Sequence, residues 1–282
     1  MLTVTNDTIV DSHHHFWNLD RLEYVWMPPA PSVLLRNYLP ETMAPLLQSS
    51  GISKTVLVQA HQSIEEAHWM LEIAETVDFV AGVVAWADLT SPSLGRDLDS
   101  LQARQGLVSI RHQVEEEPDE TWLVRPDVIA GLKEVARHDL AYDLLVKGPH
   151  IKYVPEVAEK VPDLRMVVDH IANPPIAAGE IEPWATHIAE VAAIPGVYCK
   201  ISGMVTEADH RDWSVGDLKP YVSHVAEQFG LDRLMWGSDW PVCLLASSYP
   251  GVLTSALDSI GDLSPEQRNK FLAQNAVDFY RL

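Results

Sequence analysis

Cysteine and basic residues are scarce in this sequence, and each scarcity excludes a class of protein. Only two of the 282 residues are cysteines, Cys199 and Cys243, and both lie in apolar runs. We therefore expect two buried free thiols rather than a disulfide, which favours a reducing compartment, the cytoplasm. Lysine and arginine total 20 against 40 aspartates and glutamates, a formal net charge of -20. Such a surface repels nucleic acids and anionic membranes, so we expect a small-molecule partner and neither of these.

Long apolar runs, linkers and internal repeats are absent as well. No stretch approaches the roughly 20 apolar residues that a membrane-spanning helix needs. The opening segment MLTVTNDTIVDSHHHFW has neither a basic start nor an apolar core, so we do not expect a signal peptide. With 47% hydrophobic residues and no break in composition, the chain is expected to form a single domain over residues 1–282. A homo-oligomer is compatible with this composition.

Short apolar runs rich in β-branched residues alternate with helical patterns along the chain. The runs are mostly continuous, as expected for parallel strands buried on both faces. We predict strands over Thr8–Asp11, Lys54–Gln59, Val80–Ala87, Leu107–His112, Ala141–Val146, Arg165–Asp169, Val197–Ser202 and Arg233–Gly237. We predict helices over Glu41–Ser50, Ile64–Val77, Pro92–Gln105, Pro126–His138, Tyr153–Lys160, Pro183–Ala193, Asp217–Phe229 and from the capping box at Ser264-Pro265-Glu266-Gln267 onward.

Eight strands and eight helices in strict alternation predict an α/β fold, a (β/α)8 TIM barrel. A doubly wound open sheet is the alternative, but no glycine-rich phosphate loop follows the first predicted strand. Residues Asn18–Pro40 form a long loop rich in Pro, Trp and Tyr, and such loops often cover a site. Because barrel active sites lie at the C-terminal ends of the strands, polar residues at those ends are the candidate functional residues.

Histidines and an aspartate follow three of the predicted strands. His13 and His15 are two residues apart after the first strand, so both can face the barrel mouth while His14 faces elsewhere. His170 ends strand six and Asp239 follows strand eight. Imidazole and carboxylate ligands suit a divalent metal, above all zinc. We predict a metal site at His13, His15, His170 and Asp239; the alternatives are a stray histidine cluster, a rim hydrogen bond and a helix cap.

Four further residues at strand ends are candidates for substrate binding. Arg111 and His112 end strand four, Lys200 lies in strand seven and Trp86 ends strand three. The cations are placed to contact substrate oxygens, His112 to add a polar contact and Trp86 to form an apolar wall. For the cations the alternative is an internal ion pair with Asp88, Asp143 or Asp169. For Trp86 it is ordinary packing.

In their order and residue types, these motifs resemble the lactonase branch of the amidohydrolase superfamily, which includes L-fuconolactonase and 2-pyrone-4,6-dicarboxylate lactonase. The resemblance covers nearly the whole chain, and its last motif is the most specific. The matching motifs are Asp11-Ser12-His13-x-His15-Phe16-Trp17, Arg111-His112-Gln113, Asp169-His170 with Pro174, Cys199-Lys200-Ile201-Ser202-Gly203 and Gly237-Ser238-Asp239-Trp240-Pro241-Val242-Cys243.

The resemblance implies a (β/α)8 barrel that hydrolyses a lactone ring, with a sugar lactone of the L-fucono type as the expected substrate. His13 and His15 would line the site and hold zinc, an ion that some members of the branch do without. Asp239 would take a proton from the attacking water, and His170 would polarise the carbonyl or assist the metal. No Gly-x-Ser-x-Gly motif is present, which disfavours a serine nucleophile. The alternatives are a pyrone-dicarboxylate lactonase, a metal-dependent decarboxylase of the same superfamily and a non-catalytic sugar-acid binding protein.

Overall fold

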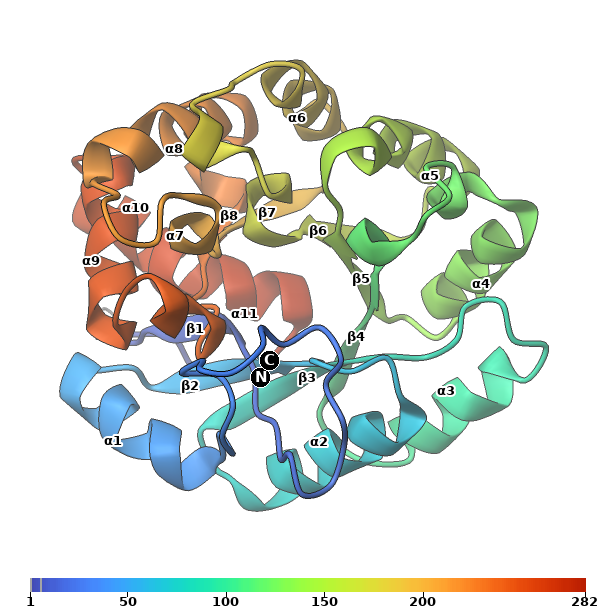
Figure 1. Ribbon diagram of the computed structural model, residues 1–282. Coiled ribbons are helices and arrows are strands. Elements are labelled where there is room, and N and C mark those ends of the chain that lie inside the picture. Colours follow the sequence, from blue (N-terminus) through green and yellow to red (C-terminus); the bar gives the residue numbers. More distant parts are fainter. Residues whose placement is uncertain (1, 6) are drawn as a thin grey trace.

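Eight parallel strands, paired in the order of the sequence, form the centre of the protein (Figure 1). The structure is a computed structural model that describes residues 2–5 and 7–282. The strands are β1 (Val10–His14), β2 (Lys54–Val58), β3 (Val80–Ala85), β4 (Leu107–Gln113), β5 (Ala141–Leu145), β6 (Arg165–Val168), β7 (Tyr198–Ile201) and β8 (Leu234–Trp236).

Backbone hydrogen bonds between β1 and the residues that follow β8 close the sheet into a barrel. The His15 N–H donates to the Trp240 carbonyl at 2.7 Å, and the Asp239 N–H donates to the His13 carbonyl at 2.8 Å. The predicted (β/α)8 barrel is therefore confirmed. The same two bonds hold the two histidine positions of β1 against Asp239, so barrel closure and site assembly share one set of contacts.

Helices surround the strands, and most begin and end within a few residues of the prediction. The helices are α1 (Pro40–Ser50), α2 (Ile64–Thr76), α3 (Leu94–Gln102), α4 (Pro126–Arg137), α5 (Val154–Lys160), α6 (Trp184–Ala192), α7 (Met204–Glu207), α8 (Val215–Phe229), α9 (Tyr249–Ile260), α10 (Pro265–Asn269) and α11 (Asn275–Tyr280). The prediction of eight helices was wrong in two places, because it omitted α9 and the single turn α7. The signals for α9 were present: Ser248 caps its start and Gly261 follows its end.

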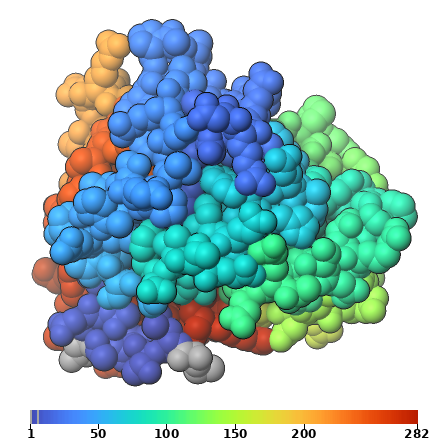
Figure 2. Space-filling model, turned by 90° about the horizontal axis from the view of Figure 1, so that it is seen from below, coloured from blue at the N-terminus to red at the C-terminus, as the bar shows by residue number. Residues whose placement is uncertain are grey.

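The C-terminal helices close the barrel at the end opposite the candidate site. Helix α10, a π turn over Lys270–Gln274 and α11 follow one another without a loop. Side chains of this segment, Ala276 and Val277 among them, pack with the apolar residues Val56 and Val167 of the strands. Figure 2 shows the first residues, in indigo, beside the red C-terminal segment, and Leu2 N–H donates to the Leu282 carbonyl.

The long loop after β1 lies at the other end of the barrel, where Figure 2 shows it in blue. Its base is fixed by two hydrogen bonds between the Trp17 and Tyr38 backbones, each 3.0 Å long. Within the loop, the Trp26 indole N–H donates to the Ala60 carbonyl at 2.7 Å, which carries this side chain to the rim of the barrel. The expectation of a loop placed over a site is thus met by its position.

Two expectations drawn from composition can be compared directly with the fold. Cys199 and Cys243 are buried free thiols, as predicted. Among the described residues, no helix combines the length and apolar character required to span a bilayer.

A glycine in α4 fits against a neighbouring loop too closely for any side chain. A Cβ atom at Gly131 would lie 2.1 Å from the Leu89 carbonyl oxygen. We expect Gly131→Ala to lower the free energy of unfolding by at least ~1–3 kcal/mol, because backbone atoms cannot yield as a side chain can. Helix propensity alone predicts the opposite sign, a gain of about 1 kcal/mol. Urea unfolding measures the change.

The matched control is Gly95→Ala in α3, where the added Cβ meets the end of the flexible Glu134 side chain. We expect this variant to equal or exceed the wild type in stability. Equal stability of the two alanine variants would contradict the close backbone contact.

Candidate active site

A β-bulge in β1 aims two histidines into the barrel mouth. Between Asp11 and His14 the register to β2 shifts, so that three residues of β1 span two of β2. His13 and His15 then lie together, with their Nε2 atoms 3.2 Å apart. His14 faces the other way and contacts Thr55 Oγ1 at 2.9 Å. His13 and His15 are almost fully buried, at 0% and 4% exposure, and of the two His15 lines the cavity at the barrel mouth.

His170 lies on a left-handed turn that continues β6. Four consecutive residues, His170 to Asn173, have φ between 47° and 61°, a conformation that L-residues other than glycine rarely adopt. The turn is held by the Asn173 N–H bond to the His170 carbonyl and by the Trp184 indole bond to the Ile171 carbonyl. The imidazole packs so closely on Gly203 that a Cβ there would lie 2.6 Å from the ring. This constrained backbone fixes the direction of the His170 side chain.

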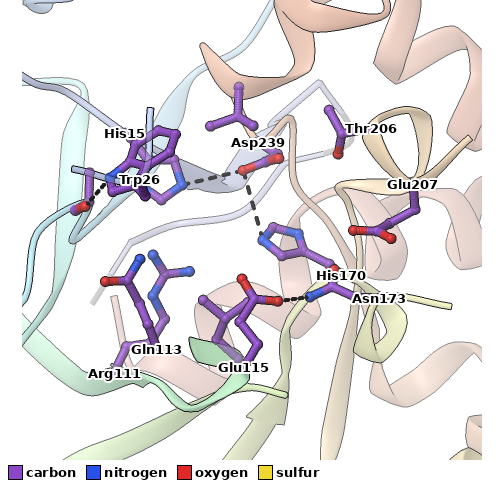
Figure 3. A pocket seen from close by; sticks show the side chains of 13 residues that line it. His15, Trp26, Arg111, Gln113, Glu115, His170, Asn173, Thr206, Glu207 and Asp239 are labelled. Carbon is purple, nitrogen blue, oxygen red and sulfur yellow. Dashed lines mark hydrogen bonds and ion pairs between the residues drawn. The ribbon is translucent and has the colours of Figure 1, made fainter. Parts of the chain in front are cut away.

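Asp239 faces the histidines from the loop after β8. Its Oδ1 atom lies 3.3 Å from His15 Nε2 and 3.8 Å from His170 Nε2 (Figure 3). Asp239 itself has a positive φ of 55°. The loop is anchored by Asp11, whose carboxylate accepts hydrogen bonds from the Ser238 N–H at 2.8 Å and the Tyr249 hydroxyl at 3.0 Å. Burial raises the pKa of Asp11 to about 6 against these hydrogen bonds, which lower it.

A buried cluster of opposite charges lies beneath His13. Lys200 Nζ contacts Asp143 at 2.5 Å and Asp169 at 2.9 Å, and Arg111 contacts Asp169 at 3.0 Å. Burial alone would raise the pKa of Asp169, but the charge of Lys200 holds it well below its usual range. Burial and the nearby Lys200 charge keep the pKa of His13 far below its usual value, so its imidazole is neutral. The cluster contains two cations and two carboxylates, and its charges cancel.

The structure places three of the four predicted substrate-binding residues away from the cavity. Lys200 is completely buried, and its ammonium group is held by the two aspartates, so the internal ion pair considered above describes it. His112 follows the inward-facing Arg111 and therefore points to the opposite side of the strand. There it contacts Glu117 at 2.7 Å and accepts a hydrogen bond from the Trp86 indole. Of this set, Arg111 alone lines the cavity.

The cavity at the mouth of the barrel measures about 210 Å³. That is below the roughly 300–1,000 Å³ of pockets for drug-sized ligands, so it suits a small molecule. Sequence reasoning located His15, His170, Asp239 and Arg111 among its lining residues. It missed Trp26, Gln113, Glu115, Asn173 and Glu207. Gln113 had a signal, because it lies two residues after Arg111 and shares its face; the others come from loops, turns and the single-turn helix α7, which are too short or irregular to show periodicity.

The histidine and aspartate side chains satisfy the chemistry of a metal site. His15 Nδ1 lies 2.8 Å from the Val58 carbonyl, an acceptor, so Nδ1 carries the proton and Nε2 of the neutral ring presents a lone pair. That lone pair faces the Asp239 carboxylate at 3.3 Å, an arrangement that repels unless a proton or a cation lies between. Ligand atoms of His13, His170 and Asp239 lie within 4.8 Å of one another. Zinc with bonds of about 2.0–2.2 Å sets its ligand atoms roughly 3.3 Å apart, so the residues fit the ion.

A family model described as amidohydrolase matches residues 10–282. The chain belongs to the amidohydrolase family. An L-fucono-1,5-lactonase from Burkholderia ambifaria is 37% identical over 278 residues, which cover 97% of this amidohydrolase and 95% of the relative. Two crystal structures of an amidohydrolase from Burkholderia multivorans have TM-scores of 0.90 and 0.88 at 31% and 32% identity. Each covers 98% of this chain and 99% of its own, and one holds HEPES, the other zinc.

These relatives place the amidohydrolase with lactonase-type hydrolases at the level of the family.

The buried Lys200 is expected to be essential for stability. Replacing it by Met removes the ammonium group between Asp143 and Asp169 and leaves two buried carboxylates facing each other. We expect Lys200→Met to lower the free energy of unfolding by ~3–5 kcal/mol, the usual effect of removing one partner from a buried ion pair. Urea unfolding followed by circular dichroism measures it.

Lys160→Met is the control, because it removes an ion pair with Glu156 of the same 2.5 Å length whose side chains are 43% and 44% exposed. An exposed pair contributes at most about 1 kcal/mol. If the two variants lose equal stability, burial of the Lys200 cluster is not what makes it important.

Proposed function

We propose that this amidohydrolase opens the ring of a sugar lactone of the L-fucono-1,5-lactone type to give the sugar acid. The observation that carries the proposal is the Asp239 carboxylate, which lines a small cavity between His15 and His170. The 37% identity to an L-fucono-1,5-lactonase over nearly the whole chain supports the choice of reaction. In keeping with its free thiols, we propose the cytoplasm as its compartment.

Asp239 acts as the general base in the proposed reaction. It takes a proton from a water molecule as the water oxygen forms a bond to the lactone carbonyl carbon. The bond between that carbon and the ring oxygen then breaks, and the proton passes from Asp239 to the ring oxygen, which becomes a hydroxyl group. The product is a sugar acid, which releases a proton at neutral pH. No covalent enzyme intermediate forms.

Arg111 and His170 stabilise the negative charge that develops on the carbonyl oxygen. Arg111 is a fixed cation at the cavity wall, held by Asp169. Burial lowers the pKa of His170 below its usual value, so its ring is neutral and can donate one hydrogen bond or bind a metal through one lone pair. Charges fixed in place before the reaction stabilise a transition state without reorganisation.

A zinc ion would be held by Asp239 and the histidines His13, His15 and His170, whose ligand atoms lie close together at the barrel mouth. When bound, such an ion polarises the carbonyl and lowers the pKa of water. The role of Asp239 as proton acceptor and the placement of Arg111 do not depend on it.

Asp239→Asn preserves the shape of the side chain and removes the base. We expect kcat for L-fucono-1,5-lactone to fall by at least ~10²–10⁴-fold, the usual contribution of general base catalysis. A pH-indicator assay follows the proton that each ring opening releases. Asp262→Asn, on the exposed loop before α10, is the matched control and should retain the wild-type rate.

A near-normal rate in the Asp239 variant would place the base elsewhere. Carbon dioxide release from an aromatic acid in place of lactone opening would favour a decarboxylase. Binding of sugar acids without turnover of any lactone would favour a binding protein.

Removal of metal tests the proposed ion separately. After exhaustive chelation we expect slower lactone hydrolysis and recovery of the rate on addition of zinc, with metal content measured by elemental analysis. Unchanged activity in protein free of metal would remove the ion from the proposal, and the lactonase assignment would remain.

A further inference from the structure

An acidic wall lines the cavity beside His170 and Asp239, two of the residues proposed for catalysis. The wall consists of Glu115, Asn173 and Glu207, which Figure 3 shows below and to the right of His170 and Asp239. Its members come from three separate places: the turn over Val114–Glu116 after β4, the end of the left-handed turn after β6 and the last residue of α7. None of the three belongs to a motif that sequence analysis singled out.

The contacts of the wall hold its carboxylates in place. Glu115 Oε2 accepts a hydrogen bond from Asn173 Nδ2 at 2.7 Å, and Glu207 pairs with Lys147 at 3.0 Å. Burial raises the pKa of Glu115, and the charge of Glu207 adds to that effect while Lys147 and Arg111 oppose it. The Glu115 side chain is therefore fixed, close to a second acid and poorly solvated.

The charges around the cavity disfavour an anionic ligand. Asp239, Glu115 and Glu207 supply three carboxylates to its lining. The two nearby cations each have a carboxylate partner: Lys147 pairs with Glu207, and Arg111 pairs with Asp169. A second carboxylate on a bound lactone would face like charge at Glu115 and Glu207 in a partly desolvated site, which is unfavourable; a zinc ion held by Asp239 and the histidines would be paired with Asp239 rather than with the acidic wall. Sugar hydroxyl groups instead donate to carboxylates, and such bonds are shorter and stronger than those between neutral groups.

We propose that Glu115 and Glu207 determine substrate specificity by binding ring hydroxyl groups of a neutral sugar lactone and by rejecting lactones that carry a carboxylate. This inference rests on the proposed lactonase function and names the substrate class that the site takes. Asn173 is a positioning residue, since its amide orients Glu115. Lys147 Nζ contacts both carboxylate oxygens of Glu207, at 3.2 and 3.0 Å, and each oxygen has a further lone pair that can accept from a ligand hydroxyl.

Glu115→Gln and Glu207→Gln test the proposal because glutamine keeps the size and an acceptor oxygen but removes the charge. Glu116→Gln is the matched control. Glu116 lies in the same turn as Glu115 but is not among the described residues that line the cavity. The substrates are L-fucono-1,5-lactone, its analogue without one ring hydroxyl, and an aldarolactone that carries a terminal carboxylate. The measured quantity is kcat/KM for each pair of enzyme and substrate.

We expect each wall variant to lose ~10-fold or more on L-fucono-1,5-lactone, in line with the loss of a hydrogen bond to a charged group. We expect the same variants to gain on the aldarolactone, so that the preference for the neutral lactone falls by roughly 100-fold. One wall variant should also discriminate less than the wild type against the deoxy analogue. The Glu116 variant should keep the wild-type preference. An unchanged preference in both wall variants overturns the inference.

A binding measurement separates this inference from the proposed reaction. Isothermal titration with L-fucose, a neutral ring without a lactone carbonyl, and with D-galacturonate requires no turnover. Weaker L-fucose binding and stronger galacturonate binding in the wall variants support the proposed role of the acidic wall, whether or not the wild type opens a lactone. A wild type that opens no lactone rejects the lactonase function alone. Absence of L-fucose binding, or binding that neither variant changes, overturns the acidic wall whatever the reaction.

Discussion

The buried contact between Lys200 and the carboxylates of Asp143 and Asp169 is the interaction on which the rest of the site depends. Both acids and the ammonium group are completely buried. An isolated charge in this position is prohibitively unfavourable, so the three groups must be held together for the barrel to fold. Asp143 also accepts hydrogen bonds from Ser109 and from Tyr280 of α11, both at 2.6 Å. The cluster thus ties the strands to the C-terminal helix that closes the barrel.

The same cluster sets the electrostatics of the mouth. Asp169 holds Arg111 at the cavity wall, and Lys200 approaches His13 Nδ1 to 3.2 Å. The positive charge of Lys200 adds to burial in keeping the imidazole of His13 neutral, the form that a metal ligand requires. A substitution deep in the barrel would therefore act on both stability and the site.

Irregular backbone at the strand ends directs the candidate catalytic side chains toward one another. The bulge in β1 turns His13 and His15 to one side, and the left-handed turn at His170 brings its ring onto Gly203. Asp239 has a positive φ as well. Each of these conformations costs on the order of 1–3 kcal/mol, and the surrounding hydrogen bonds and packing offset that cost. Of the seven described non-glycine residues with positive φ, five lie at these strand ends, His170 to Asn173 and Asp239; the other two are Asp139 and Arg281.

The barrel itself was predictable from the sequence because local residue patterns indicate its strands and helices. Continuous apolar runs and helical stripes each depend on a few neighbouring residues, and their alternation allows few topologies. The same logic found Asp239 and the pair His13 and His15, since strand ends in a barrel converge. It failed for α9, although Ser248 before this helix and Gly261 after it are start and stop signals.

The sequence by itself determined the fold class, the strand ends that meet at the mouth and the histidine and aspartate residues gathered there. Only the tertiary structure decided which side chains reach the cavity. Lys200 and Arg111 were equivalent as cations in the sequence, yet one is enclosed by two acids and the other lines the site. Glu115 lies in the turn after β4 and Glu207 ends α7 after β7, and their approach depends on contacts between residues far apart in the chain. Periodicity predicts the direction of a side chain within one helix or strand, whereas packing sets the distance between residues of different elements.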